Sequence, residues 1–92
     1  MPTTSLKIVN TLGLHARAAA KFVGRAKVFE SEIKIGHEDR LVDGKSIMNV
    51  MLLAAPLGSQ IELSVTGPDE DAAFADLTEL IRQGFDEDVV DD

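Results

Sequence analysis

The sequence predicts an α+β domain in which three helices cover one face of a four-stranded antiparallel sheet, in the order βαββαβα. Two patterns carry this prediction: short segments in which apolar and polar residues alternate, and longer ones in which apolar residues recur every three or four positions. Alternating strands have one buried and one exposed face, which is typical of an antiparallel sheet covered on one side. A chain of 92 residues, 45% of them hydrophobic, has room for one such two-layer core and not for a second domain.

The first part of the chain predicts a strand, a glycine loop and an alanine-rich helix. The strand is expected at residues 4–9, where Leu6 and Ile8 alternate with polar residues. A loop around Gly13 leads into a helix over residues 16–28, whose alanines favour helical structure. The predicted apolar stripe of this helix consists of Ala16, Ala19, Ala20, Val23 and Ala26.

A hairpin and a short helix are expected next. Residues 31–36 and 40–43 predict two short strands around a polar turn at residues 36–39. We interpret His37, in this turn, as a surface residue. A short helix is expected over residues 46–53, and a proline and a glycine mark the loop after it.

The last strand and the last helix show the clearest patterns. Over residues 60–66 every second residue is Ile, Leu or Val, which predicts a strand with one buried face. The last helix starts at Gly67-Pro68, has acidic residues at positions 69–71 in its first turn, and is expected to stop at Gly84. Its predicted inward-facing residues are Ala73, Leu77, Leu80 and Ile81.

Charge is distributed unevenly along the chain. Residues 1–29 contain five basic residues and no acidic one, whereas the remainder contains four basic and all sixteen acidic residues. The net charge of −7 argues against nucleic acids and anionic membranes as partners. The basic segment indicates either an acidic partner or simply a solvated helix face. Residues 86–92, with five acidic residues, are expected to form an acidic tail outside an ordered domain of about residues 4–85.

Several kinds of chemistry are disfavoured by what the chain lacks. Without cysteine it has no disulfide, thiol nucleophile or zinc–thiolate site. Neither His15 nor His37 has a partner at metal-ligand spacing, so we expect no metal and no cofactor. No segment approaches the roughly 18–20 apolar residues of a membrane span, and the start does not have the layout of a signal peptide. These features predict a cytoplasmic protein without membrane insertion.

The strongest candidate site is His15, immediately before the alanine-rich helix. The backbone N–H groups of Ala16 and Arg17 lie at the positive end of that helix, where an anion is stabilised. The guanidinium of Arg17 matches the oxygens of a phosphate group. An imidazole is a nucleophile near neutral pH, so this arrangement suits a phosphohistidine. A plain capping or surface histidine is the alternative.

Two motifs in the chain resemble those of the HPr family, the histidine-containing phosphocarriers of the bacterial phosphoenolpyruvate-dependent phosphotransferase system. Leu12-Gly13-Leu14-His15-Ala16-Arg17 resembles its active-site motif, and Lys45–Met51 resembles its regulatory-serine segment. The family fold is an open-faced β-sandwich, in agreement with the elements above. The resemblance implies that phosphorylated enzyme I phosphorylates His15 on Nδ1 and that His15 passes the phosphoryl group to a downstream acceptor. Arg17 would stabilise the phosphate, in a carrier rather than an independent turnover enzyme.

Two further sites have both a structural and a functional interpretation. Ser46 is expected to be the N-cap of the short helix, and the resemblance adds that HPr kinase/phosphorylase phosphorylates it. The short helix has more apolar residues than one face can bury. Either Ile47 and Val50 are buried, with or without Met51, or Ile47, Met48 and Met51 form an exposed docking patch. The expected partner-docking residues are Ala20, Lys21, Ile47, Met48 and Met51, and the basic residues expected to steer an acidic partner are Arg17, Lys21 and Lys27.

The chain departs from the family pattern at one position and combines features of two branches of the family. Ala18 stands where the family usually has proline; alanine keeps the helix but loses the rigidity of proline, so we expect the fold and activity to be retained and the rate of transfer or the identity of the partner to be affected. Lys45–Met51 is similar to the sugar-transport carriers, whereas the segment 84–88 is similar to the nitrogen-related paralogue. Other functions are a regulatory binding module controlled by Ser46 phosphorylation and a structural adapter with neither modification. A carrier that meets its partners one at a time is expected to be a monomer.

Overall fold

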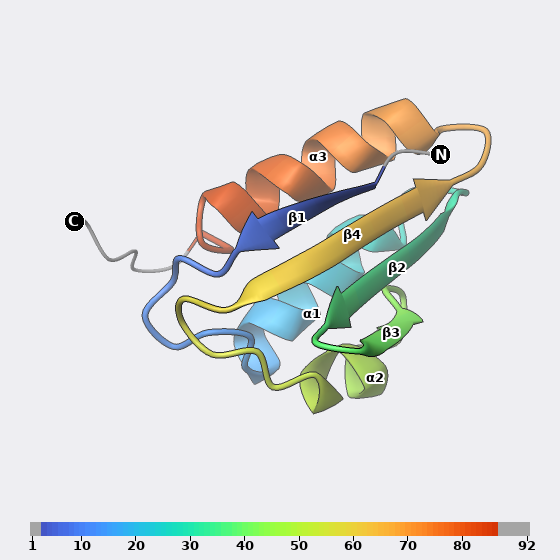
Figure 1. The fold of residues 1–92 in the computed structure, drawn as a ribbon. Coiled ribbons are helices and arrows are strands. Elements are labelled where there is room, and N and C mark those ends of the chain that lie inside the picture. The colour runs from blue at the N-terminus through green and yellow to red at the C-terminus, as the bar shows by residue number, and fades with distance from the viewer. Residues whose placement is uncertain (1–2, 87–92) are drawn as a thin grey trace.

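The computed structural model describes residues 3–86 and has the predicted element order (Figure 1). Its elements are β1 (Thr3–Lys7), α1 (Ala16–Ala26), β2 (Glu32–His37), β3 (Arg40–Asp43), α2 (Ile47–Leu52), β4 (Gln60–Thr66) and α3 (Glu70–Arg82). Apart from Asp86, the predicted acidic tail lies outside the described residues. No helix within residues 3–86 is long and apolar enough to cross a membrane.

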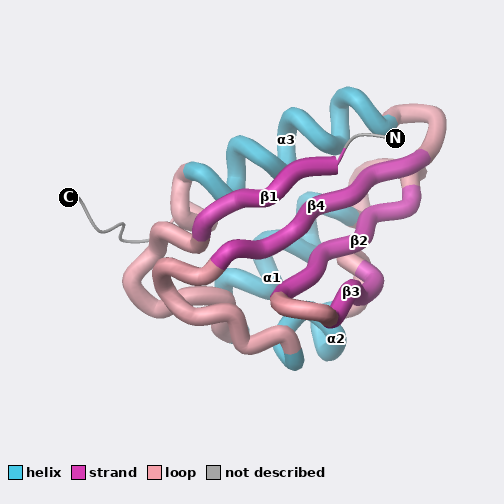
Figure 2. Tube along the Cα trace, viewed as in Figure 1, coloured by secondary structure: helices cyan, strands magenta, loops and turns pink. Residues whose placement is uncertain are grey.

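The four strands form one antiparallel sheet in the order β1-β4-β2-β3. The last strand of the chain therefore lies between the first and the second. Figures 1 and 2 show the three helices on one side of this sheet, with the other face uncovered. The predicted open-faced α+β architecture is confirmed.

The core lies between the sheet and the helices, where the alternation of β4 meets the stripe of α3. Ile61, Leu63 and Val65 of β4 are fully buried, and the residues between them point to the uncovered face. All four predicted inward residues of α3 are buried as well. Gly84 ends this helix with a positive φ of 70°, as expected.

The buried face of α1 differs from the predicted stripe. Ala16 and Ala20 are exposed, and the buried residues are Ala18, Ala19, Phe22, Val23 and Ala26. The prediction followed the alanines and left out Phe22, which is fully buried. Because an aromatic side chain removes far more apolar surface from water than a methyl group, the helix is turned so that Phe22 faces the core.

His37 is the second correction. It ends β2 instead of lying in the turn, which consists of Glu38, with a positive φ of 58°, and Asp39. Its side chain is only 14% exposed, and its Nδ1 lies 3.2 Å from the carbonyl oxygen of Leu53. The prediction of a surface histidine is therefore wrong, because one more residue of strand pairing brings the ring onto the helix-covered face beside Ile33 and Ile35.

The start of α3 is the third difference. Asp69 is the N-cap residue rather than part of the first turn. Its carboxylate accepts hydrogen bonds from the backbone N–H groups of Glu30 and Ser31, each at 2.9 Å, and from the Ser31 hydroxyl. Asp69 thus ties the start of α3 to the segment before β2.

Candidate functional site

A loop held by its own hydrogen bonds leads into the candidate site. The Asn10 side-chain amide donates to the carbonyl oxygen of Gly13 at 2.8 Å, and that same oxygen accepts the N–H of His15 at 3.1 Å. The N–H of Leu14 donates to the carbonyl oxygen of Ala55 at 2.8 Å. Gly13 has a φ of +70°, and a Cβ there would lie 2.7 Å from the same Ala55 oxygen. Only glycine fits, so the loop is pressed against the segment after α2.

His15 is the N-cap of α1, as predicted. Its backbone is extended, and its carbonyl oxygen accepts the N–H of Ala19 at 2.8 Å, the first hydrogen bond of the helix. The Nδ1 atom of the ring accepts the N–H of Arg17 at 3.3 Å. A ring nitrogen that accepts a hydrogen bond presents its lone pair, so Nδ1 is directed at the start of the helix.

The helix start around His15 is suited to an anion. The N–H groups of Ala16, Arg17 and Ala18 precede the first helical bond, and the helix dipole places positive charge there. All of α1 is described, and its first turn has no acidic residue. Arg17, in the first turn of the helix, is exposed. Backbone donors and a guanidinium together match the oxygens of a phosphoryl group.

The five basic residues of the first 29 do not form one patch. Lys7 alternates with the buried Leu6 on β1, so it points to the uncovered face of the sheet. Lys27 is the C-cap of α1, about 16 Å along the helix from its start. Arg17 and Lys21 remain near His15, and their spacing of four residues puts them on the same side of the helix.

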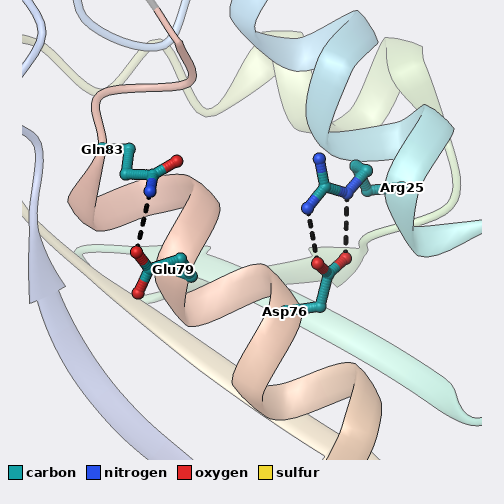
Figure 3. A network of polar contacts seen from close by, with 4 residues as sticks. All are labelled: Arg25, Asp76, Glu79 and Gln83. Atoms are coloured by element: carbon teal, nitrogen blue, oxygen red, sulfur yellow. Dashed lines mark hydrogen bonds and ion pairs between the residues drawn. The ribbon is translucent and has the colours of Figure 1, made fainter.

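Arg25, the remaining basic residue, is paired with Asp76 of α3 (Figure 3). Two bonds of 2.9 and 2.5 Å join the guanidinium to the carboxylate. The hydrogen bond and the charge of Asp76 raise the pKa of Arg25, and the same hydrogen bond lowers the pKa of Asp76. Figure 3 also shows Gln83 donating to Glu79 one turn further along α3. Arg25 therefore links two helices instead of adding to the charge at the site.

The short helix α2 packs beside α1 and presents an apolar surface (Figure 1). We call this surface the α2 patch; it consists of Ile47, Met48, Met51 and Leu52, which are 39–68% exposed. Only Val50 of this helix is buried, so the alternative in which Ile47 and Met51 join the core is wrong. Ala20 is exposed and Lys21 partly exposed.

Some exposed apolar residues were not predicted from the sequence. Leu52 belongs to the α2 patch, and Leu12 and Leu57 are exposed in the two loops that the Leu14–Ala55 hydrogen bond joins. Leucine is usually assigned to the core, and the one available signal was the excess of apolar residues in so short a helix.

Ser46 is the N-cap of α2, as predicted. Its hydroxyl accepts the N–H of Asn49 at 3.4 Å, and its carbonyl oxygen accepts the N–H of Val50 at 3.0 Å. The residue is partly exposed beside the α2 patch. Within residues 3–86, no group of three or more His, Asp or Glu side chains is arranged to hold a metal ion.

Comparison with known proteins identifies close relatives over nearly the full chain. A family model described as the PTS HPr component phosphorylation site matches residues 2–83. The phosphocarrier protein HPr of Pseudomonas putida is 52% identical over 88 residues, covering 95% of this chain and 98% of that protein. A crystal structure of HPr from Thermoanaerobacter tengcongensis has a TM-score of 0.91 at 39% identity and covers 97% of this chain and 100% of its own. The Bacillus subtilis protein Crh, described as a catabolite repression protein and a domain-swapped dimer, has a TM-score of 0.73 at 31% identity and covers 99% and 100% of the two chains.

Proposed function

The chain belongs to the HPr family, the phosphocarrier proteins of the phosphotransferase system, and we propose that it carries the phosphoryl group on Nδ1 of His15. In this role it accepts the group from phosphorylated enzyme I and passes it to a downstream acceptor protein. The observation that carries the proposal is the bond from the Arg17 N–H to His15 Nδ1 at the start of α1. It directs the ring's lone pair to a place where an anion is stabilised.

The geometry supports a simple transfer step. The Nδ1 lone pair attacks phosphorus, a new N–P bond forms, and the bond between phosphorus and the donor atom breaks. The N–H of Arg17, which donates to Nδ1 before transfer, then donates to a phosphoryl oxygen. Because the loop holds the ring at the helix start beforehand, little rearrangement is needed.

Arg17 supplies positive charge from a side chain rather than from the backbone. Its guanidinium is exposed and can contact two oxygens of a phosphoryl group during transfer. Phosphoryl transfer depends mainly on positioning and charge stabilisation, so a shallow site is sufficient if each partner covers it. This accounts for a carrier that does not turn over a substrate by itself.

Enzyme I and the acceptor would dock on the α2 patch together with Ala20 and Lys21. Methionine side chains adapt to different partners, which suits one surface that serves two proteins in turn. Arg17 and Lys21 would steer an acidic partner; Lys27, at the other end of α1, would contribute less. We infer a cytoplasmic monomer, with one ordered domain of about residues 4–85 and the tail beyond it.

The decisive experiment is incubation with phosphoenolpyruvate and enzyme I. We expect one phosphate per chain that is labile in acid and stable in base, as a phosphohistidine is, and no labelling of His15→Ala. His37→Gln is the matched control, since it removes the other histidine and should be labelled normally. Labelling that persists in His15→Ala would overturn the assignment.

A second function is supported by Ser46, an N-cap beside the docking surface. Phosphorylation by HPr kinase/phosphorylase would add negative charge where the helix dipole tolerates it and would repel acidic enzyme I. The chain would then also act as a regulatory binding module. Ser46→Asp should raise the KM of enzyme I for this protein about tenfold. Ser46→Thr, which keeps an N-cap hydroxyl, should leave that KM unchanged. An unchanged KM in Ser46→Asp would exclude this control.

A further inference from the structure

The α2 patch contains two of the three methionines of the chain, Met48 and Met51. They are three positions apart in the sequence and therefore lie on the same side of the helix. Met48 is 68% exposed and Met51 39%. Two thioethers are thus open to solvent within a surface that is otherwise aliphatic.

These two methionines are the main targets of an oxidant, because the chain has few other side chains that react with one. The chain has no cysteine, tryptophan or tyrosine, so no thiol competes for an oxidant. The third methionine, Met1, lies outside the described residues. Within residues 3–86, all the sulfur therefore lies on the docking surface.

We propose that Met48 and Met51 form a reversible oxidation site through which hydrogen peroxide weakens the docking of phosphoryl-transfer partners. A sulfur lone pair attacks one peroxide oxygen, the O–O bond breaks, and a sulfoxide and one water molecule result. Sulfur loses two electrons, which the peroxide gains. The inference rests on the proposed role of the α2 patch in docking.

Oxidation should change the surface without unfolding the helix. The anchoring residue of α2 is Val50, which is fully buried whereas both methionines are exposed, and the Ser46 cap involves neither methionine. A sulfoxide oxygen, in contrast, must lose its water when an apolar partner surface covers it. We therefore expect the KM for enzyme I to rise by about tenfold, with kcat nearly unchanged because neither residue touches His15 chemistry.

The test treats the full chain with graded hydrogen peroxide and follows two measurements. Peptide mass spectrometry should show one added oxygen on Met48 and on Met51, and steady-state phosphorylation by enzyme I should give the KM. Treatment with both stereospecific methionine sulfoxide reductases should restore the original KM. The control is the double variant Met48→Leu/Met51→Leu, which keeps Met1 and an apolar patch. The KM of enzyme I for this variant should be the same before and after peroxide treatment.

The two proposals fail in different ways. If the untreated chain takes no phosphoryl group from enzyme I on His15, the proposed function is wrong. If the untreated chain is phosphorylated normally, and oxidation either leaves Met48 and Met51 unmodified or leaves the KM unchanged, the oxidation site is refuted. A KM that rises equally in the leucine control would also refute it.

Discussion

The starts of α1 and α3 use the same helix-terminal physics for opposite purposes. At α3, the carboxylate of Asp69 bonds to Glu30 and Ser31, and a carboxylate oxygen of Glu70 accepts the N–H of Gly67 at 3.1 Å. At α1 the cap is the imidazole of His15, and the first turn has no acidic residue. The protein's own anions occupy the first terminus, whereas the second is left suited to an anion that arrives and leaves. The proposed transfer site therefore lies at the terminus whose cap and first turn carry no carboxylate.

The largest effect is expected when the start of α1 is made to resemble the start of α3. Ala16→Glu places a carboxylate in the first turn of α1, at an exposed position. We expect the rate of His15 phosphorylation to fall about 10- to 100-fold, because two negative groups would compete for one terminus. The unfolding free energy should rise by about 0.3–1 kcal/mol from the helix dipole. Ala16→Gln is the uncharged control, and an equal loss of rate in it would show that charge is not the cause.

The next largest effect is expected from removing positive side chains of α1, one that acts on the phosphoryl group and one that only steers the partner. Arg17→Ala is expected to lower kcat/KM for phosphoryl transfer about tenfold at all salt concentrations, because the guanidinium acts on the phosphoryl group itself. Lys21→Ala should lower it about two- to threefold, and only at low ionic strength, because screening removes long-range steering. Stopped-flow phosphorylation at two salt concentrations distinguishes the two. A similar salt response in both variants would contradict a direct role for Arg17.

Removing the carboxylate of Asp69 at the start of α3 should lower the stability of the chain and leave the rate of phosphoryl transfer unchanged. The hydrogen bond from the Ser31 hydroxyl, followed by that from Glu30, lowers the pKa of Asp69 below its ordinary value of 3.8. Its stabilising contribution is thus fully present above pH 3.8 and is lost as the pH falls through the lowered folded value. In urea at pH 7, Asp69→Asn should have a lower free energy of unfolding than the native chain. The difference between the two free energies should become smaller in acid. A gap that is independent of pH would exclude the charged carboxylate as its source.

The smallest effect is expected from a change that makes the first turn of α1 more rigid. Ala18 lies in the first turn, before the first helical hydrogen bond, which Ala19 donates. Ala18→Pro should therefore stabilise the chain by about 0.4–1 kcal/mol by restricting the unfolded state, a rise in Tm of about 2–6 °C. The phosphorylation rate should change little. Because Ala18 is fully buried, a lower Tm would mean that the ring does not fit the core.

Local features of this fold could be predicted and contacts between distant segments could not. The strand at residues 60–66 and the caps His15 and Ser46 depend on neighbouring residues, and all three were predicted correctly. The buried face of α1 is also a local feature, because Ala19, Phe22, Val23 and Ala26 fit one helical stripe; the predicted stripe differs from it because it includes Ala16 and Ala20 in place of Phe22. The bonds between Asp69 and Ser31, in contrast, join residues 38 positions apart. The exposure of Leu52 depends on which face of α2 packs against the core.

The placement of β4 between β1 and β2 determines when the protein can begin to work. Within residues 3–86, the only sheet neighbour of β1 is β4, and the loop before His15 is pressed against Ala55. During synthesis, the amino-terminal strand and the loop before His15 must therefore wait for partners about 40 to 60 residues further along the chain. Such long-range pairing makes folding a late and concerted event. A nascent chain that stops before residue 55 would lack both Ala55 and β4, so we expect that such an incomplete protein would not hold His15 in place and would not accept a phosphoryl group.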